Sequence, residues 1–215
     1  MPESTNTFDY IEVNMLSFSG FKTVGLINEV KSSKAAVITF GRFNPITSGH
    51  EKVVNTVLQW ASSKRADALI FPSQSEDPKK NPLLYKDKVK YMKQLFPKAK
   101  IINDLSVKNV FYALKMLSAA GYKDVTLVVG SDRVEEFDAQ IRKYIKHPDA
   151  TKSYDFDNFK VINAGEREGA ISASLMRQYA KDDDFESFKK GLPSTATKSI
   201  ASAIFKDVRK GMKIT

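Results

Sequence analysis

The chain has no cysteine among its 215 residues, and histidine occurs only at His50 and His147. The lack of cysteine excludes a disulfide framework and a thiolate zinc site, and it is consistent with a reducing compartment. Two histidines are too few for a histidine-rich metal cluster. We therefore expect no metal site built from the protein's own side chains.

Long apolar runs are missing as well. No stretch approaches the roughly 20 consecutive apolar residues that a membrane-spanning helix needs. Residues 1–30 carry acidic side chains early and lack a basic segment followed by an apolar run, so they do not resemble a signal peptide. These absences predict a cytoplasmic protein without a membrane partner.

The charge balance is basic, with 34 Lys and Arg residues against 25 Asp and Glu residues and a formal net charge of +9. An excess of this size suits a polyanionic partner, either nucleotide phosphates or nucleic acid, although solubility alone also explains it. Nucleic acid is therefore a possible partner but not the favoured one. The densest lysine cluster comprises Lys79, Lys80, Lys86, Lys88, Lys90 and Lys93.

The order of apolar segments predicts an α/β fold. Short apolar runs typical of strands alternate with longer segments whose apolar residues recur at helical spacing. This alternation predicts a Rossmann-like, five-stranded, mostly parallel sheet with helices on both faces. The expected strands are Ala35–Phe40, Ala68–Phe71, Lys100–Ile102, Val125–Val129 and Phe159–Ile162, and the clearest helices are His50–Ala61, Tyr85–Phe96 and Val110–Leu117.

Three regions are expected along the chain. Residues 1–33 form an N-terminal extension, residues 34–180 form the core, and residues 181–215 form a C-terminal helical segment. In the last region, Asp182–Asp184 is typical of a helix start, Gly191–Pro193 is a break, and Thr195–Met212 resumes with helical spacing.

The segment with the clearest chemistry runs from Ala35 to His50, where an apolar strand leads through a loop into an amphipathic helix. Gly41 permits a close approach to a ligand, because a Cβ atom would clash there. Thr47 and Ser48 supply hydroxyls beside the N–H groups of the new helix, and His50 falls in its first turn. A helix N-terminus with such side chains is suited to binding a phosphate.

This loop resembles the first signature, (His/Thr)-x-Gly-His, of the nucleotidyltransferase superfamily of α/β phosphodiesterases, in the form Thr47-Ser48-Gly49-His50. The second signature of that superfamily, Ile-Ser-x-(Ser/Thr)-x-x-Arg, is matched by Ile171 to Arg177. The two matches lie in the expected order, and the resemblance covers roughly Lys34 to Ala180. Alone, the second segment also fits an ordinary capped helix with a surface arginine.

The resemblance implies transfer of a nucleoside monophosphate from a nucleoside triphosphate, accompanied by Mg²⁺, to a small phosphorylated acceptor. It implies direct in-line attack on the α-phosphorus, with pyrophosphate leaving and no covalent enzyme intermediate. His50, Thr47 and Arg177 are the implied catalytic residues. The nucleotide-binding residues it implies are Gly41, Arg42, Phe43, Gly49, His50, Ser172, Ser174 and Arg177.

The acceptor is less clearly indicated. Residues 81–92 are similar to a region of nicotinamide mononucleotide adenylyltransferases, with Asp87-Lys88 in place of Glu-Arg, and an exposed amphipathic helix explains them equally well. Lys79, Lys80 and Lys88 are candidate contacts for a substrate phosphate. Asp132 is a candidate for a ribose hydroxyl or the acceptor, or it caps the following helix.

Adenylyl transfer is favoured over cytidylyl transfer, because Glu166–Ser172 matches the cytidylyltransferase motif only in part. ATP and an acceptor such as nicotinamide mononucleotide are therefore the first expectation. One alternative is a cytidylyltransferase that uses CTP and a sugar or alcohol phosphate. Another is a basic nucleic-acid-binding or assembly protein that keeps the fold without the reaction. An oligomer is possible.

Overall fold

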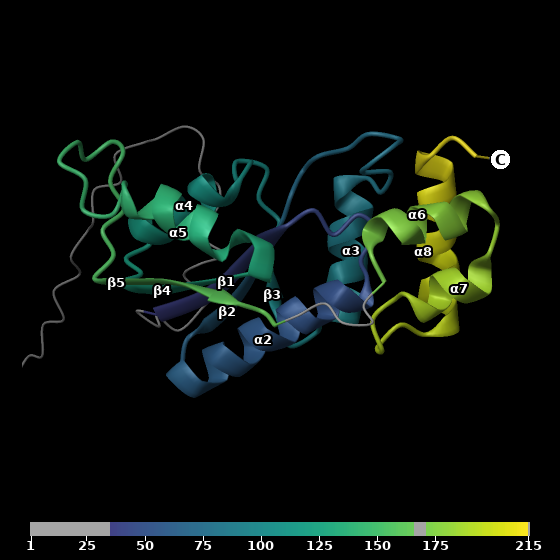
Figure 1. Ribbon diagram of the computed structural model, residues 1–215, viewed down its shortest axis with the longest axis horizontal. Helices are drawn as coiled ribbons and strands as arrows, with labels where there is room; N and C mark the ends of the chain where they lie inside the picture. Colours follow the sequence, from purple (N-terminus) through teal and green to yellow (C-terminus); the bar gives the residue numbers. More distant parts are fainter. Residues whose placement is uncertain (1–34, 166–170, 215) are drawn as a thin grey trace, which may run out of the picture.

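The computed structural model describes residues 35–165 and 171–214, so the expected N-terminal extension, residues 1–33, lies outside the described residues. Element labels follow Figure 1. The strands are β1 (Ala35–Gly41), β2 (Asp67–Pro72), β3 (Lys100–Ile101), β4 (Asp124–Val129) and β5 (Asn158–Asn163). The helices are α2 (Ser48–Lys64), α3 (Tyr85–Leu95), α4 (Val110–Ala119), the short 3₁₀ turn η1 (Ser131–Arg133), α5 (Val134–Arg142), α6 (Ala173–Lys181), α7 (Phe185–Lys190) and α8 (Lys198–Gly211).

The five strands form one sheet in the order β3-β2-β1-β4-β5, and every pairing between these strands is parallel. The predicted Rossmann-like α/β architecture is therefore confirmed. The chain runs outward from β1 to β3 and then returns to β4 on the other side of β1. A parallel sheet opens a crevice at such a reversal, at the carboxyl ends of the strands, so the loops that follow β1 and β4 border the expected ligand site.

Helices cover both faces of the sheet because the side chains of β1 alternate between two apolar cores. Val37 belongs to the core that contains α2 and α3, while Ala36 and Ile38 belong to the core that contains α4. Figure 1 shows α2 on one side of the sheet and α4 and α5 on the other. All three of these β1 side chains are at most 1% exposed, which is typical of a central parallel strand.

The C-terminal helices continue the first of these cores. Met92 and Leu95 of α3 and Ile204 and Phe205 of α8 belong to the same buried cluster, and α6, α7 and α8 group beside α3 in Figure 1. The Tyr91 hydroxyl of α3 donates to the Asp207 carboxylate at 2.5 Å. The segment after residue 180 therefore packs onto the helices beside the sheet through apolar contacts.

Two helices differ from the sequence expectations, one in where it begins and one in having had no predicted range. α8 begins at Lys198 instead of Thr195, since the Thr197 side chain accepts the main-chain N–H of Ile200 and so caps the helix. α5, for which no range was predicted, has one buried residue, Ile141, and therefore gives a weak apolar pattern. No helix of the described residues is both long enough and apolar enough to cross a membrane.

Candidate active site

The loop after β1 is shaped by contacts within itself. The Phe43 ring lies over Gly41, where a Cβ atom would come within 2.9 Å of the ring. Phe43 has a φ of 48°, a left-handed conformation that costs roughly 1–2 kcal/mol for a residue with a side chain. The sequence predicted that a ligand approaches Gly41 closely, but the Phe43 ring occupies the space beside this glycine.

Thr47 and His50 form a reciprocal capping box at the start of α2. The main-chain N–H of His50 bonds to Thr47 Oγ1 at 3.4 Å, and the main-chain N–H of Thr47 donates to His50 Nδ1 at 3.0 Å. Because a main-chain N–H can only donate, Nδ1 is the acceptor nitrogen and the neutral imidazole carries its proton on Nε2. The Phe43 ring, 4.8 Å from the imidazole between centroids, packs beside it.

The C-terminal segment also contacts the start of α2. The main-chain N–H of Ser48 donates to the Gly191 carbonyl at 2.8 Å. The Glu51 carboxylate accepts from the main-chain N–H of Ser194 at 3.0 Å and from its hydroxyl at 2.5 Å. One of the helix N–H groups expected to face a phosphate is therefore used internally, and the turn that contains Gly191 and Ser194 holds α2 in place.

Asn44, which the sequence analysis did not select, connects three parts of the site. Its side-chain amide donates to the Leu83 carbonyl at 2.9 Å and accepts from the Leu83 N–H at 2.8 Å. Its own carbonyl accepts from Arg177 Nη1 at 2.8 Å. Asn44 is only 2% exposed, so it fixes the loops after β1 and β2 against each other. Nothing in an isolated Asn-Pro pair indicates such long-range contacts.

Arg177 joins the two sequence signatures across 133 positions of the chain. It bonds to the Asn44 carbonyl and, through Nη2, to the Ser174 hydroxyl at 3.0 Å. Burial lowers the pKa of Arg177, and the nearby charge of Arg42 lowers it further. Ser172 caps α6 by accepting the N–H of Leu175 at 3.1 Å, so this serine starts the helix that carries the arginine.

Lys88 lies beneath the loops and not on an exposed helix face. Its ammonium is fully buried and donates to the main-chain carbonyls of Arg42 at 3.0 Å and Ser73 at 2.5 Å. Burial lowers the pKa of Lys88 to about 8. These two carbonyls follow β1 and β2, so the ammonium ties the ends of neighbouring strands together. Direct contact of Lys88 with a substrate stays a prediction.

Lys79 and Lys80 are exposed on a turn organised by Asp77. The Asp77 carboxylate accepts the main-chain N–H groups of Lys80 at 2.7 Å and Lys79 at 3.0 Å, and the Asn81 side chain at 2.6 Å. The Lys80 bond is the main reason that the pKa of Asp77 lies below its usual value. Asp77 also interacts electrostatically with Arg177, which places this turn near the two signatures.

Asp132, by contrast, lies exposed in η1, after β4 at the other side of the crevice, and Arg133 is the N-cap residue of α5.

Ser73 is 4% exposed and its hydroxyl has no hydrogen-bond partner within the described residues. Among the same residues, no group of three or more His, Cys, Asp or Glu side chains is placed to hold a metal ion.

The sequence pattern of the cytidylyltransferase-like family matches residues 38–179, which is well over half of the chain. The protein therefore belongs to the cytidylyltransferase-like family. Both signatures and all of the contacts around Asn44 and Arg177 fall inside this matched range. No curated protein sequence matches the chain.

Two solved structures share the fold at low sequence identity. One is a bifunctional NMN adenylyltransferase/ADP ribose pyrophosphatase from Francisella tularensis, with a TM-score of 0.52, 13% identity, and coverage of 83% of this chain and 52% of the other. The second is Thermotoga maritima TmcAL bound with alpha-thio ATP, with a TM-score of 0.52, 12% identity, and coverage of 84% and 56%. The chain thus spans little more than half the length of these structures.

Proposed function

We propose that the protein transfers AMP from ATP to a small phosphorylated acceptor, such as nicotinamide mononucleotide, with release of pyrophosphate. The observation that carries this proposal is the bond between Arg177 and the Asn44 carbonyl. It brings the guanidinium of the second signature onto the loop that leads into α2, whose first turn carries His50. Both groups border the carboxyl edge of the sheet, where a parallel fold binds its ligand.

In the proposed reaction, an acceptor phosphate oxygen attacks the α-phosphorus, and the bond between the α-phosphorus and the bridging oxygen breaks. His50 donates from Nε2 to an α-phosphate oxygen, and Thr47 fixes the imidazole for that contact. Arg177, Ser172 and Ser174 hold the β- and γ-phosphates, whose charge grows as pyrophosphate leaves. A general base is not needed, because the acceptor phosphate is ionised at neutral pH. The nucleotide side of the proposed site is formed by Gly41, Arg42, Phe43 and Gly49.

Mg²⁺ is proposed to arrive with the triphosphate. The described residues offer no cluster of carboxylates for it, and Mg²⁺ commonly keeps several waters while it binds substrate phosphates. Lys79, Lys80 and Asp132 are the proposed contacts for the acceptor. Lys88 is proposed to support the site by holding the main-chain carbonyls of Arg42 and Ser73.

A second candidate is cytidylyl transfer from CTP to a sugar or alcohol phosphate. The family match supports it, since that family is described as cytidylyltransferase-like. The fold of the NMN adenylyltransferase enzyme and of the protein bound with alpha-thio ATP supports the adenylyl reaction. The two candidates share the chemistry assigned to His50 and Arg177 and differ only in the base and the acceptor.

The proposal is tested by measuring pyrophosphate release with ATP or CTP, Mg²⁺ and a panel of phosphorylated acceptors that includes nicotinamide mononucleotide. We expect release with ATP and one acceptor, and a loss of at least roughly a hundredfold in His50→Ala, as removal of one transition-state donor usually causes.

The matched control is His147→Ala, which removes the only other histidine of the chain, far along the sequence in the loop after α5. It should release pyrophosphate at the wild-type rate. Equal activity in wild type and His50→Ala would refute the proposed role of His50. Release with CTP alone would transfer the proposal to the cytidylyl reaction.

A further inference from the structure

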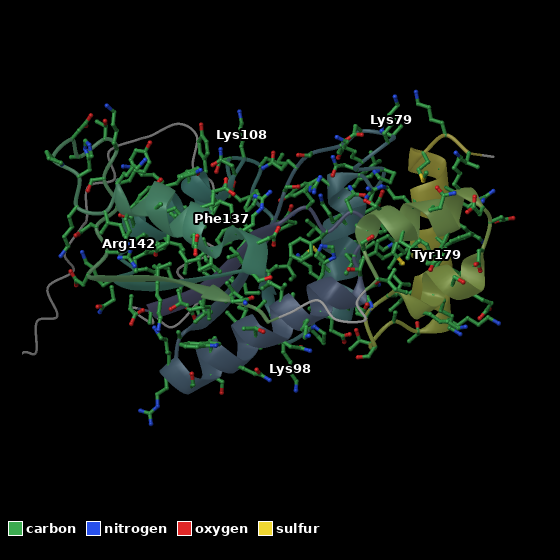
Figure 2. All side chains as sticks on the ribbon, viewed as in Figure 1. Lys79, Lys98, Lys108, Phe137, Arg142 and Tyr179 are labelled. Atoms are coloured by element: carbon green, nitrogen blue, oxygen red, sulfur yellow. The ribbon has the colours of Figure 1, made fainter. Side chains whose placement is uncertain are left out.

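A line of positive charge begins beside the two signatures and continues onto the C-terminal helix. Its start is the turn of Asp77, which interacts electrostatically with Arg177 and whose carboxylate binds the N–H groups of Lys79 and Lys80. Two residues beyond Lys80, the carbonyl of Pro82 packs against Gly211. The turn and the last residues of α8 are therefore neighbours, and Figure 2 shows Lys79 beside this end of the helix.

The line then follows α8. Lys206 and Lys210 lie one turn apart, about 6 Å along the axis at 1.5 Å per residue, and Lys213 follows just beyond the end of the helix. These three lysines border a surface depression of about 660 Å³. We call the set Lys79, Lys80, Lys206, Lys210 and Lys213 the basic strip.

The positive charges of the strip at the end of α8 are poorly compensated. Within the described part of the chain, the side chains of Lys206, Lys210 and Lys213 form no ion pair or hydrogen bond. The one carboxylate that lines the depression, Asp183, pairs with Arg209 at 3.0 Å. Favourable charges at a helix C-terminus account for one or two cations there, but not for a line that crosses to a second element.

Two aromatic residues, Phe185 and Phe205, line the same depression. Phe185 is partly exposed, and its ring meets that of Phe205 edge to face at 5.4 Å. A ring beside cations is the arrangement with which proteins bind single-stranded nucleic acid, and Phe185 lines the same depression as Lys206, Lys210 and Lys213.

We propose that the basic strip binds the phosphate backbone of a single-stranded nucleic acid, with a base against Phe185. A flexible strand can turn from α8 onto the loop of Lys79, and lysines spaced along its course neutralise successive phosphates while a ring accepts a stacked base. This binding does not depend on nucleotidyl transfer, although Lys79 and Lys80 are also proposed contacts for the acceptor, so the variants that test it change only the lysines at the end of α8.

The test is fluorescence anisotropy of a labelled short oligoribonucleotide titrated with the full chain between about 50 and 200 mM salt. Five neutralised phosphates predict a slope of about −3.5 for log affinity against log salt, at roughly −0.7 per phosphate for a single strand. The variant K206Q/K210Q/K213Q should reduce the slope to about −1.4 and weaken binding at least tenfold. The variant K98Q/K108Q/K143Q changes the net charge equally at exposed lysines elsewhere and should bind like wild type.

Equal losses in the two triple variants would overturn the proposal, because binding would then follow net charge alone. Absence of binding at about 50 mM salt would overturn it as well. So would equal competition by anionic lipid vesicles or by polyglutamate, which would assign the strip to another partner. Pyrophosphate release by K206Q/K210Q/K213Q should match wild type, which separates this result from the outcome for the proposed transfer reaction.

Discussion

At the scale of single residues, the site depends on side chains that bind main-chain groups. Asn44, Lys88 and Glu51 each contact the backbone of a segment distant in sequence. Such contacts fix loops with the accuracy that phosphate positioning requires. They also explain why a list of expected ligands, taken from the signatures, omits much of what builds the site.

Arg177 provides the sharpest test of a residue role. The two terminal nitrogens of its guanidinium bind different partners: Nη1 donates to the Asn44 carbonyl and Nη2 to the Ser174 hydroxyl. A lysine is a point charge and cannot keep both contacts while gripping phosphate. We expect Arg177→Lys to weaken triphosphate binding at least tenfold in calorimetry, while the exposed Arg142→Lys binds normally. Unchanged affinity of Arg177→Lys for the triphosphate would show that Arg177 does not hold the β- and γ-phosphates.

Lys88 predicts a pH dependence of stability. Because burial lowers its pKa from 10.5 to about 8, the unfolded chain binds more protons than the folded chain between these values. The contribution of Lys88 to the free energy of unfolding therefore rises as the pH increases from about 8 to 10.5. By linkage, the unfolding free energy of wild type should gain about 2–3 kcal/mol over that of Lys88→Met between about pH 7 and pH 10.

Urea denaturation of both proteins at the two pH values measures this difference. Lys86→Met, which changes an exposed lysine on the same helix, is the control and should show no comparable change against wild type. A constant difference between wild type and Lys88→Met across the range would mean that Lys88 titrates like a solvent-exposed lysine.

At the scale of elements, the sequence predicted the strands and the central helices within a few residues. Strong apolar runs such as Val37–Phe40 and the spacing of Val53, Val54 and Val57 specify an element type almost regardless of context. The short η1 and α5 gave no comparable pattern, since α5 has a single buried residue. The burial of Lys88 was not foreseen either, because it depends on carbonyl groups in the loops that follow β1 and β2.

The junction of α8 with the loop after β2 is the element contact most open to mutation. A Cβ atom at Gly211 would lie 1.8 Å from the Pro82 carbonyl oxygen, a backbone atom that cannot rotate away. Gly211→Ala should therefore destabilise the protein by about 1–3 kcal/mol, despite the better helix propensity of alanine.

The measurement is equilibrium unfolding in urea, with Lys206→Ala on the exposed face of the same helix as a control that should change stability by less than about 0.5 kcal/mol. A stable Gly211→Ala protein would show that α8 packs more loosely against the loop than the structure indicates.

At the scale of the whole molecule, the sequence indicated both halves of the candidate site but not the way in which they are joined. Local patterns indicated Thr47–His50 and Ile171–Arg177, because each is a capped helix start with side chains that are proposed to bind phosphate. The two segments meet through Asn44, and the turn of Gly191 and Ser194 supports α2. Both arrangements rely on the buried cluster that α3, α6 and α8 share. Long-range contacts of this kind leave no periodic pattern in a sequence.

The most direct test of the central claim follows the fate of a label. ATP labelled at the α-phosphorus is incubated with Mg²⁺ and the acceptor that supports pyrophosphate release, in parallel with ATP labelled at the γ-phosphorus. The α-label should appear in the joined product and the γ-label only in pyrophosphate, with both signals at least roughly a hundredfold slower in His50→Ala. Transfer of the γ-label to the acceptor, or an α-label product that forms equally fast without His50, would contradict nucleotidyl transfer at this site.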